Sequence, residues 1–226
     1  MTETNLSLHL VKNGDFINLK FTGYVEGKPF DSNILEDLKK LNEKAEPQKT
    51  IIIVGKEMVV RGLDSAIIGK EFGKEYKITV SPKEGFGPRH KELIRTIPLK
   101  VFAHQRVMPK PGAAFVLDNQ LARVIAVSGA RVITDFNNPL AGKEIEYKFT
   151  AVSIVDDLKE KAEAVCKLLL HFIPKIEIDN GKIILNGPKI LEEFIRRNEF
   201  KFKELLNADI EFKELQEEKE QVPDLQ

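Results

Sequence analysis

Side chains that carry acid–base, nucleophilic or metal chemistry are widely separated in this sequence of 226 residues. The four histidines, His9, His90, His104 and His171, lack the spacing of metal ligands. The single cysteine, Cys166, falls near the apolar face of a predicted helix, where a buried thiol is more typical than a nucleophile. The sequence has neither a phosphate-binding loop nor a Gly-x-Ser-x-Gly motif. We therefore expect no metal and no cofactor.

The composition is typical of a soluble globular protein and limits the classes of partner. Lys and Arg together number 35, and Asp and Glu also number 35, so the net charge is zero. Such a chain has no strong basic field for nucleic acid or an anionic membrane. The longest apolar runs are too short to cross a bilayer, and the first residues do not form a signal peptide. Because a single cysteine forms no internal disulfide, we expect a cytoplasmic protein. From the charge balance and the short apolar runs, we expect no nucleic-acid and no membrane partner.

Short motifs rich in aromatic residues, valine and glycine follow one another in a specific order. Any one of them is a weak signal, because an isolated Phe or Val is usually a core residue. Asp31 alone would be interpreted as a turn or cap residue. The order of the whole set carries the information. The motifs are Phe21-Thr22-Gly23-Tyr24, Gly27-Lys28-Pro29-Phe30-Asp31-Ser32, Val54-Gly55-Lys56, Val59-Val60-Arg61-Gly62-Leu63-Asp64-Ser65-Ala66-Ile67, Val80-Ser81-Pro82, Glu84-Gly85-Phe86-Gly87, and later Asp135-Phe136-Asn137-Asn138-Pro139-Leu140-Ala141-Gly142-Lys143 and Tyr147.

Apolar periodicity predicts the elements that position these motifs. Alternation of apolar and polar residues around Phe21 predicts a half-buried strand. Helices are expected over 34–41 and 60–68, the first with Asp31 and Ser32 as candidate caps. Further strands are expected at 50–54, 76–80 and 145–155.

From residue 89 to residue 138 the pattern changes to short β-type runs separated by prolines. Strands are expected at 115–117, 123–127 and 131–134, and a turn at Ser128-Gly129 joins the last two. No long helix is predicted in this region. We expect a small all-β unit of about fifty residues.

Residues 156–226 predict a further small domain. Apolar residues at helical spacing extend over 156–172, and Asn180-Gly181 separates two short alternating runs. A helix is expected after Pro188, and a last strand over 210–215. The predicted order is α-β-β-α-β.

The ordered motifs resemble the FKBP-type peptidyl-prolyl isomerases over residues 13–155. The insert at 89–138 resembles that of the SlyD-like branch, in which a chaperone module interrupts the flap over the active site. The tail is similar in architecture to that of the long archaeal members with an extra C-terminal domain. The resemblance implies an α+β fold with three domains. These are an FKBP-like antiparallel sheet wrapped on a short helix over 1–88 plus 139–155, an insert-in-flap domain over 89–138, and the α-β-β-α-β domain over 156–226.

The reaction that this resemblance implies suits a chain without acid–base or metal residues at catalytic spacing. Rotation about an Xaa-Pro bond meets a barrier of about 18–20 kcal/mol because the amide is resonance-stabilised. A pocket that removes water from the carbonyl favours the twisted, less polar amide of the transition state. Aromatic walls around a proline ring provide such a pocket.

By resemblance, apolar side chains wall this pocket, Asp31 is a polar group at its edge and Leu63 is its floor. Phe21 and Phe86 stand where the family commonly has Tyr. The two missing hydroxyls predict a working but slower isomerase with weaker affinity for macrolide inhibitors. The catalytic residues that the resemblance implies are Phe21, Phe30, Asp31, Val59, Val60, Leu63, Phe86 and Tyr147.

The insert implies a second function, the binding of unfolded or nascent polypeptide clients. A unit of this size buries only part of its apolar surface, so an exposed groove with open strand edges is expected. The alternative is a tight β core with no apolar residue to spare. The expected client-binding residues are Val101, Phe102, Val107, Phe115, Val116, Val124, Ile125 and Val132.

Two other functions stay open on the sequence. A holdase chaperone with a degenerate isomerase pocket would fit the missing hydroxyls at Phe21 and Phe86. An assembly adaptor would act through residues 156–226, by forming a homodimer or by docking on another assembly. Absence of isomerase activity would favour the first, and loss of a dimer on deletion of residues 157–226 would favour the second.

Overall fold

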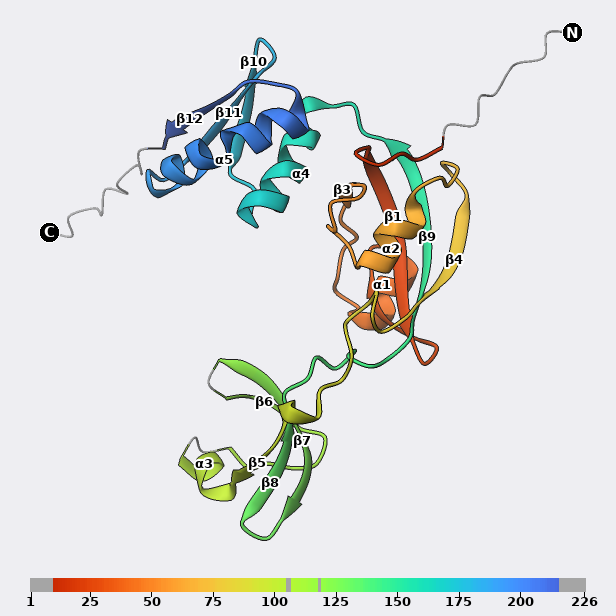
Figure 1. Cartoon of the computed structure of the whole chain (residues 1–226), viewed down its shortest axis with the longest axis vertical. Helices are drawn as coiled ribbons and strands as arrows, with labels where there is room; N and C mark the ends of the chain where they lie inside the picture. Colours follow the sequence, from red (N-terminus) through yellow and green to blue (C-terminus); the bar gives the residue numbers. More distant parts are fainter. Residues whose placement is uncertain (1–9, 105–106, 118, 216–226) are drawn as a thin grey trace, which may run out of the picture. The chain divides into compact units, whose positions relative to one another are not determined.

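The computed structural model describes residues 10–104, 107–117 and 119–215 (Figure 1). The chain divides into two compact units. The main unit contains residues 1–23, 29–78 and 147–226, and the flap unit contains residues 24–28 and 79–146. Residues 89–138 lie in the flap unit, and we call them the insert.

The main sheet has five strands and carries most of the aromatic motif residues. Its strand order is β2-β1-β9-β4, and β3 pairs with β1 in antiparallel register. The buried side chains of β9 alternate with more exposed ones, as expected for a sheet with one covered face. The strands are β1 (Phe16–Val25), β2 (Lys28–Ser32), β3 (Ile51–Ile53), β4 (Glu75–Val80) and β9 (Ile145–Ile154).

Two short helices accompany this sheet. α2 (Arg61–Ile67) buries Leu63 and Ile67, and it lies over one face of the sheet (Figure 1). α1 (Leu35–Leu41) has no buried residue. The prediction that Asp31 or Ser32 caps α1 is wrong, because the cap position is Ile34 and no side chain caps it. The Ser32 hydroxyl instead accepts a hydrogen bond from the Ile34 amide at 3.0 Å, which closes a turn before the helix.

The insert contains an antiparallel sheet in the order β5-β8-β7-β6. Its strands are β5 (Ile94–Pro98), β6 (Ala114–Leu117), β7 (Gln120–Ser128) and β8 (Arg131–Asp135). The three predicted strands and the turn at Ser128-Gly129 are therefore confirmed. The prediction of an all-β insert is wrong, because a 3₁₀ turn η1 (Lys91–Leu93) and a helix α3 (Leu99–His104) are also present.

The helix α3 forms because its burial supplies the insert with a core. Phe102 is fully buried together with Val124 of β7 and Val132 of β8. Its ring meets the Phe115 ring edge-on, with centroids 4.8 Å apart. One face of the insert sheet is therefore covered by α3, which a period-2 pattern alone does not indicate.

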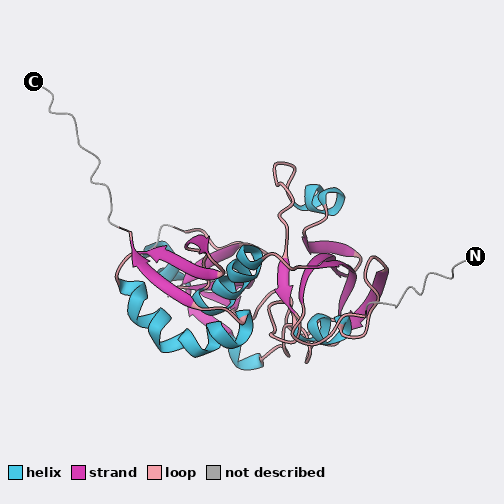
Figure 2. Ribbon diagram, turned by 90° about the horizontal axis from the view of Figure 1, so that it is seen from above, coloured by secondary structure: helices cyan, strands magenta, loops and turns pink. Residues whose placement is uncertain are grey.

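The C-terminal elements have the predicted α-β-β-α-β order. Figure 2 shows both helices and strands near the end of the chain marked C. β10 and β11 form an antiparallel hairpin, and β12 pairs with β11 in parallel. The elements are α4 (Leu158–Leu170), β10 (Lys175–Asp179), β11 (Lys182–Gly187), α5 (Ile190–Leu206) and β12 (Ile210–Glu214).

These elements belong to the main unit and do not form a separate compact unit. Phe16 of β1 and Ile53 of β3 lie in the same apolar cluster as Val165 and Cys166 of α4. Cys166 is fully buried, and burial raises the pKa of its thiol to about 12. The expected boundary at residue 156 therefore crosses a shared core, and Cys166 is a packing residue.

Candidate active site

Three aromatic side chains from adjacent strands form the centre of the candidate site. Phe21 lies on β1, Phe30 on β2 and Tyr147 on β9. The Tyr147 ring centroid is 6.2 Å from that of Phe21 and 6.1 Å from that of Phe30. The second pair is close to edge-on, at 72°. Both spacings lie within the range of favourable aromatic pairs, so the three rings form one apolar wall.

Gly23 makes this ring cluster possible. A Cβ atom at Gly23 would lie 2.7 Å from Cζ of Phe30 and 2.8 Å from Cε1 of Tyr147. Real Cβ atoms do not approach other atoms so closely, so a side chain at Gly23 would displace the half-buried Phe30 ring or the buried Tyr147 ring. Gly23 belongs to the Phe21-Thr22-Gly23-Tyr24 motif, but the motif alone does not indicate this steric role.

Asp31 places a carboxylate next to this wall. Its side chain is exposed, yet neighbouring protein atoms remove part of its hydration and raise its pKa, while the Ser32 amide acts in the opposite direction. Tyr147 is buried, and its burial raises the pKa of the phenol well above 10.0. The negative charge of Asp31 raises it further. At neutral pH the phenol is therefore protonated and its hydroxyl is a hydrogen-bond donor.

Val59, Val60 and Leu63 lie where the chain enters α2. Val60 is the residue before the helix, with extended ψ of 134°, and Leu63 is fully buried in the first turn. Val59 and Val60 are half-buried, so each retains surface that a substrate could contact. The floor position implied for Leu63 stays a prediction, and full burial is what that position would require.

A buried carboxylate fixes the loop that leads to these residues. Asp64 Oδ1 accepts a hydrogen bond from the Gly55 amide at 2.9 Å, and Oδ2 accepts one from the Glu57 amide at 2.8 Å. Gly55 has φ of +81°, and a Cβ there would lie 1.8 Å from Oδ1 of Asn13. The loop before Val59 is thus held by backbone hydrogen bonds and by a position that requires glycine. Sequence reasoning missed Asp64, since a carboxylate in a helix is usually a surface residue.

Polar side chains also fix the strand that carries Phe21. The Phe21 amide donates to Asn33 Oδ1 at 2.8 Å, and Asn33 Nδ2 donates to the Leu19 carbonyl at 2.7 Å. Thr22 Oγ1 donates to Asp37 Oδ2 at 2.9 Å. Asn33 therefore pairs with β1 in the way that a neighbouring strand would. No pattern in the sequence indicates this role for Asn33.

Phe86 is the one implied catalytic residue in the flap unit; the other seven lie in the main unit. It is half-buried and lies within a compact turn. In that turn the Gly87 amide donates to the Pro82 carbonyl at 2.7 Å, and the Glu84 amide donates to the Ser81 carbonyl at 3.1 Å. In the main unit, ring contacts join Phe21 and Phe30 to Tyr147, and Asp31 acts on the Tyr147 phenol through its charge.

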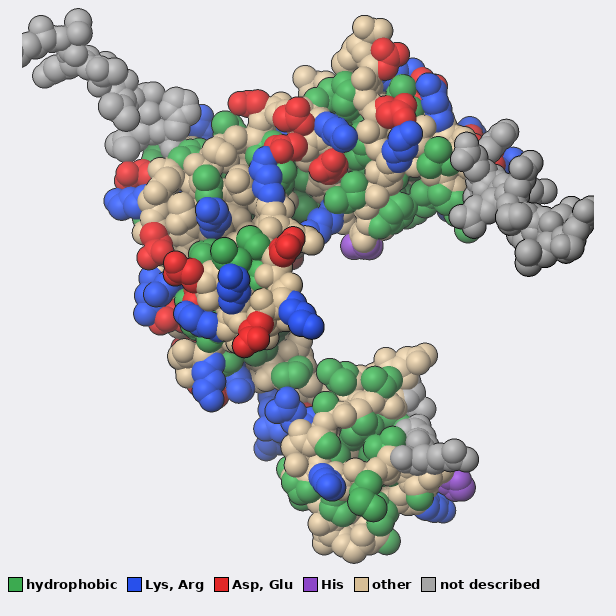
Figure 3. Space-filling view, turned by 180° about the vertical axis from the view of Figure 1, so that it is seen from behind, with side chains coloured by type: hydrophobic (Ala, Val, Ile, Leu, Met, Phe, Trp, Pro, Cys, Tyr) green, Lys and Arg blue, Asp and Glu red, His purple; other side chains and the backbone are tan. Residues whose placement is uncertain are grey.

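The structure narrows the set of expected client-binding residues. Phe102, Val124 and Val132 form the buried core of the insert, so the expectation that they contact clients is wrong. Val101 and Phe115 are half-buried. Val107, Val116 and Ile125 are exposed, and Val116 is the most exposed of the three, at 60%. Figure 3 shows hydrophobic side chains on the visible face of the insert.

Two kinds of feature are absent from the described part of the chain. No group of three or more His, Cys, Asp or Glu side chains there could hold a metal ion. No helix there is long and apolar enough to cross a membrane.

Comparison with known proteins places this geometry in a family context. Residues 9–101 match the sequence model of the FKBP-type peptidyl-prolyl cis-trans isomerases, and residues 95–140 match that of the FKBP26 IF domain. The short-type peptidyl-prolyl cis-trans isomerase of Methanocaldococcus jannaschii is 33% identical over 144 residues, which are 62% of this chain and 91% of that protein.

The SlyD isomerases of two bacteria are also similar. The protein of Haemophilus influenzae is 30% identical over 103 residues, 44% of this chain and 54% of that protein. The protein of Treponema pallidum is 29% identical over 106 residues, 45% of this chain and 60% of that protein. Against these two relatives the chain therefore covers less than two thirds of their length.

Proposed function

The chain belongs to the family of FKBP-type peptidyl-prolyl cis-trans isomerases, and from this premise we propose that it isomerises Xaa-Pro bonds of unfolded or partly folded proteins in the cytoplasm. We also propose that its insert binds those clients. The observation that carries the first proposal is the ring cluster of Phe21, Phe30 and Tyr147, with the Asp31 carboxylate near Tyr147. Exposed apolar side chains on the insert support the second.

The proposed catalysis rests on the exclusion of water. In the planar amide, resonance places negative charge on the oxygen before proline, and twisting removes that resonance. An apolar pocket is a poor solvent for the polar planar amide and a better one for the twisted transition state. The rings of Phe21, Phe30 and Tyr147 supply the apolar wall, and Leu63 supplies a rigid buried base. Val59 and Val60 would contact the substrate from the loop before α2.

Tyr147 and Asp31 supply the polar groups of the proposed site. The raised pKa keeps the Tyr147 phenol protonated at neutral pH, so it can donate a hydrogen bond to a substrate carbonyl. Asp31 is exposed at the edge of the cluster and would act on the substrate through its charge. No proton transfer is required, which is consistent with a site that lacks a nucleophile.

Client binding is supported by the outer face of the insert sheet. Val116 of β6 is paired in register with Leu121 of β7, and these side chains are 60% and 56% exposed. β6 is also an edge strand of its sheet. An exposed apolar face of this kind favours binding of an extended chain that lies along it.

Exchange spectroscopy on a short Xaa-Pro peptide tests the isomerase proposal separately from client binding. The full chain is expected to accelerate cis–trans exchange of the peptide. The double variant Val116→Asp/Leu121→Asp should leave that acceleration unchanged and should bind an unfolded client less tightly. Absence of acceleration, together with retained client binding, would favour the holdase function instead.

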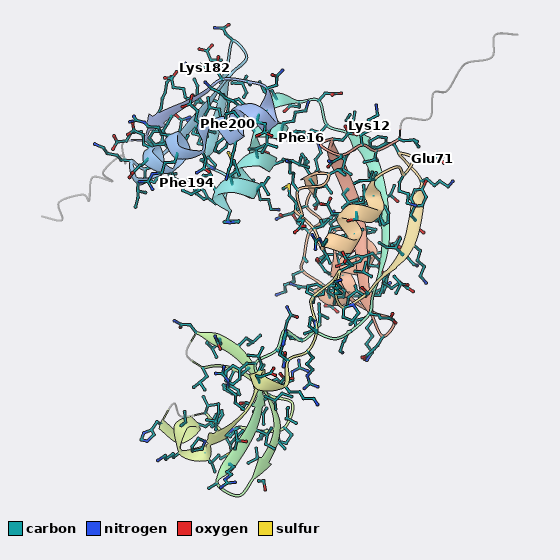
Figure 4. All side chains as sticks on the ribbon, viewed as in Figure 1. Lys12, Phe16, Glu71, Lys182, Phe194 and Phe200 are labelled. Atoms are coloured by element: carbon teal, nitrogen blue, oxygen red, sulfur yellow. The ribbon has the colours of Figure 1, made fainter. Side chains whose placement is uncertain are left out.

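We further propose a homodimer through the C-terminal elements, because α5 exposes large apolar side chains. Ile190 is 83% exposed and Phe200 is 78% exposed. Figure 4 labels Phe194 and Phe200, which both lie on α5. An antiparallel pairing of two α5 helices about a two-fold axis at Arg197 would set Phe194 of one copy against Phe200 of the other. The same axis would set Glu193 against Lys201.

Sedimentation equilibrium of the full chain tests this dimer. We expect a mass near twice that of the chain at micromolar concentration and a monomer mass for Phe200→Glu. Ile178→Glu, at an exposed apolar position of β10, is the matched control and should remain dimeric. A concentration-independent monomer mass for the unmodified chain would contradict the proposal.

A further inference from the structure

The insert differs in charge from the rest of the chain. Residues 89–138 contain eight Lys or Arg and three Asp or Glu, whereas the whole chain contains 35 of each class. The insert therefore carries a net charge of +5 and the rest of the chain −5. A small basic unit attracts acidic segments of other polypeptides and repels basic ones.

A hollow of about 290 Å³ lies in the flap unit beside β7. Its apolar wall includes Leu121 and Ile125 of β7 and Pro139 of the segment that follows the insert. The cationic side chains Arg89, Arg123 and Lys143 also line it and outnumber its one carboxylate, Asp135. The hollow can therefore accept an apolar group and an anionic group together.

The three cations differ in how far they are already neutralised. Arg89 Nη2 lies 2.5 Å from Asp135 Oδ2. Desolvation raises the pKa of Asp135, but hydrogen bonds from Asn137 and from Arg89 together lower it further than that, which keeps the carboxylate ionised. Lys143 Nζ lies 3.1 Å from Glu26 in an exposed pair that water screens. Arg123 takes part in no ion pair within the described residues. Its guanidinium is therefore the group best placed to bind an incoming carboxylate.

The strand register sets the spacing between this cation and the exposed apolar surface. Arg123 pairs with Ala114 of β6, and Leu121 pairs with Val116. Leu121 and Arg123 are two residues apart, so they share one face of the sheet at a separation of about 7 Å. A client strand lying along this face would present residues i and i+2 to Leu121 and Arg123.

We propose that the insert selects client segments in which an Asp or Glu lies two residues from an apolar side chain. The carboxylate binds Arg123, with Lys143 as a second cation, and the apolar side chain packs on Val116 and Leu121. A charge-assisted, bidentate contact from Arg gives this selection its geometry. The inference rests on the proposed client binding by the insert and names the class of client.

Fluorescence anisotropy with two labelled peptides tests the selection on the full chain. Both peptides are extended and proline-free with Leu at position i, and they differ only by Glu or Lys at i+2. We expect the Glu peptide to bind about tenfold more tightly, because a hydrogen bond to a charged group contributes on that order. Arg123→Glu should abolish or reverse the preference.

Arg131→Glu is the matched control. Arg131 is exposed at the start of β8 and does not line the hollow, but its substitution changes the net charge of the insert equally. Retained preference in Arg131→Glu and lost preference in Arg123→Glu would support the site. Equal binding of both peptides, or equal loss in both variants, would overturn it while client binding stands. Failure of both peptides to bind, with refolding yields of a client also unchanged, would overturn client binding itself.

Discussion

The ring cluster of the main unit and the outer face of the insert both present apolar side chains, but they are built in opposite ways. Around Phe21 and Tyr147, polar side chains such as Asn33 and Asp64 hold the backbone in place. On the insert, Val116 and Leu121 project from an edge strand and its neighbour and are largely exposed. A rigid dry wall is suited to chemistry by exclusion of water, whereas an exposed face is suited to loose binding of many chains.

The largest expected difference between the two regions concerns stability. Leu63→Ala removes a fully buried side chain and should lower the free energy of unfolding by about 2–5 kcal/mol. Val116→Ala on the insert should change it by less than about 0.5 kcal/mol, because the side chain is exposed. Urea denaturation of both variants measures the change in the free energy of unfolding. Similar losses in both would remove the distinction between a packed site and a surface site.

Gly23→Ala tests whether the ring cluster requires glycine at position 23. The added methyl group meets Phe30 and Tyr147, and we expect about 1–3 kcal/mol of destabilisation with reduced kcat/KM on a short Xaa-Pro peptide. The double variant Gly23→Ala/Phe30→Leu should recover part of the stability. If it recovers none, contact with the Phe30 ring is not the reason that glycine is required.

Alkaline pH should affect the main unit through Tyr147. Its folded pKa is raised, so the stabilisation is present below about pH 10 and is lost as the pH rises and the unfolded phenol ionises first. The loss from this group is at most about 1.4 kcal/mol per pH unit. Denaturation at pH 9 and at pH 11 should show a smaller fall for Tyr147→Phe than for the unmodified chain. An identical fall would contradict the burial argument.

The smallest expected effect is a gain. Phe86→Tyr adds a hydroxyl at a position where the resemblance to the family implies Tyr, and kcat/KM or macrolide affinity should rise by up to about tenfold. Val116→Thr, which adds a hydroxyl on the insert, should change neither on a short peptide. If Phe86→Tyr is also silent, the missing hydroxyl does not limit the rate.

Strands and tight turns could be predicted from the sequence, because alternation of apolar residues and turn residues determine them locally. The strands around Phe21 and those of the insert alternate clearly, and the hairpin at Asn180-Gly181 has strong turn residues. α3 was missed because burial of Phe102 stabilises it, and that contact is not local in sequence. For the same reason Val124 faces the core and not a client.

The family resemblance predicted a set of candidate site residues. It did not predict the polar side chains that hold the backbone around them. Asp64 and Asn33 bind backbone groups, and polar residues in such roles have the same sequence signature as surface residues. The packing of Phe16 and Ile53 against α4 likewise depends on the tertiary structure. Composition of the whole chain also concealed the basic insert, since the two parts cancel to zero net charge.

Proline-limited refolding of an unfolded protein, with catalytic amounts of this chain, tests the central claim most directly. The account predicts that the slow refolding phase accelerates in proportion to the amount of chain added, and that Leu63→Ala reduces the acceleration at a temperature where this variant is folded. An unchanged slow phase, with the refolding yield still altered, would contradict the isomerase proposal and would leave a chain that binds clients without isomerising them.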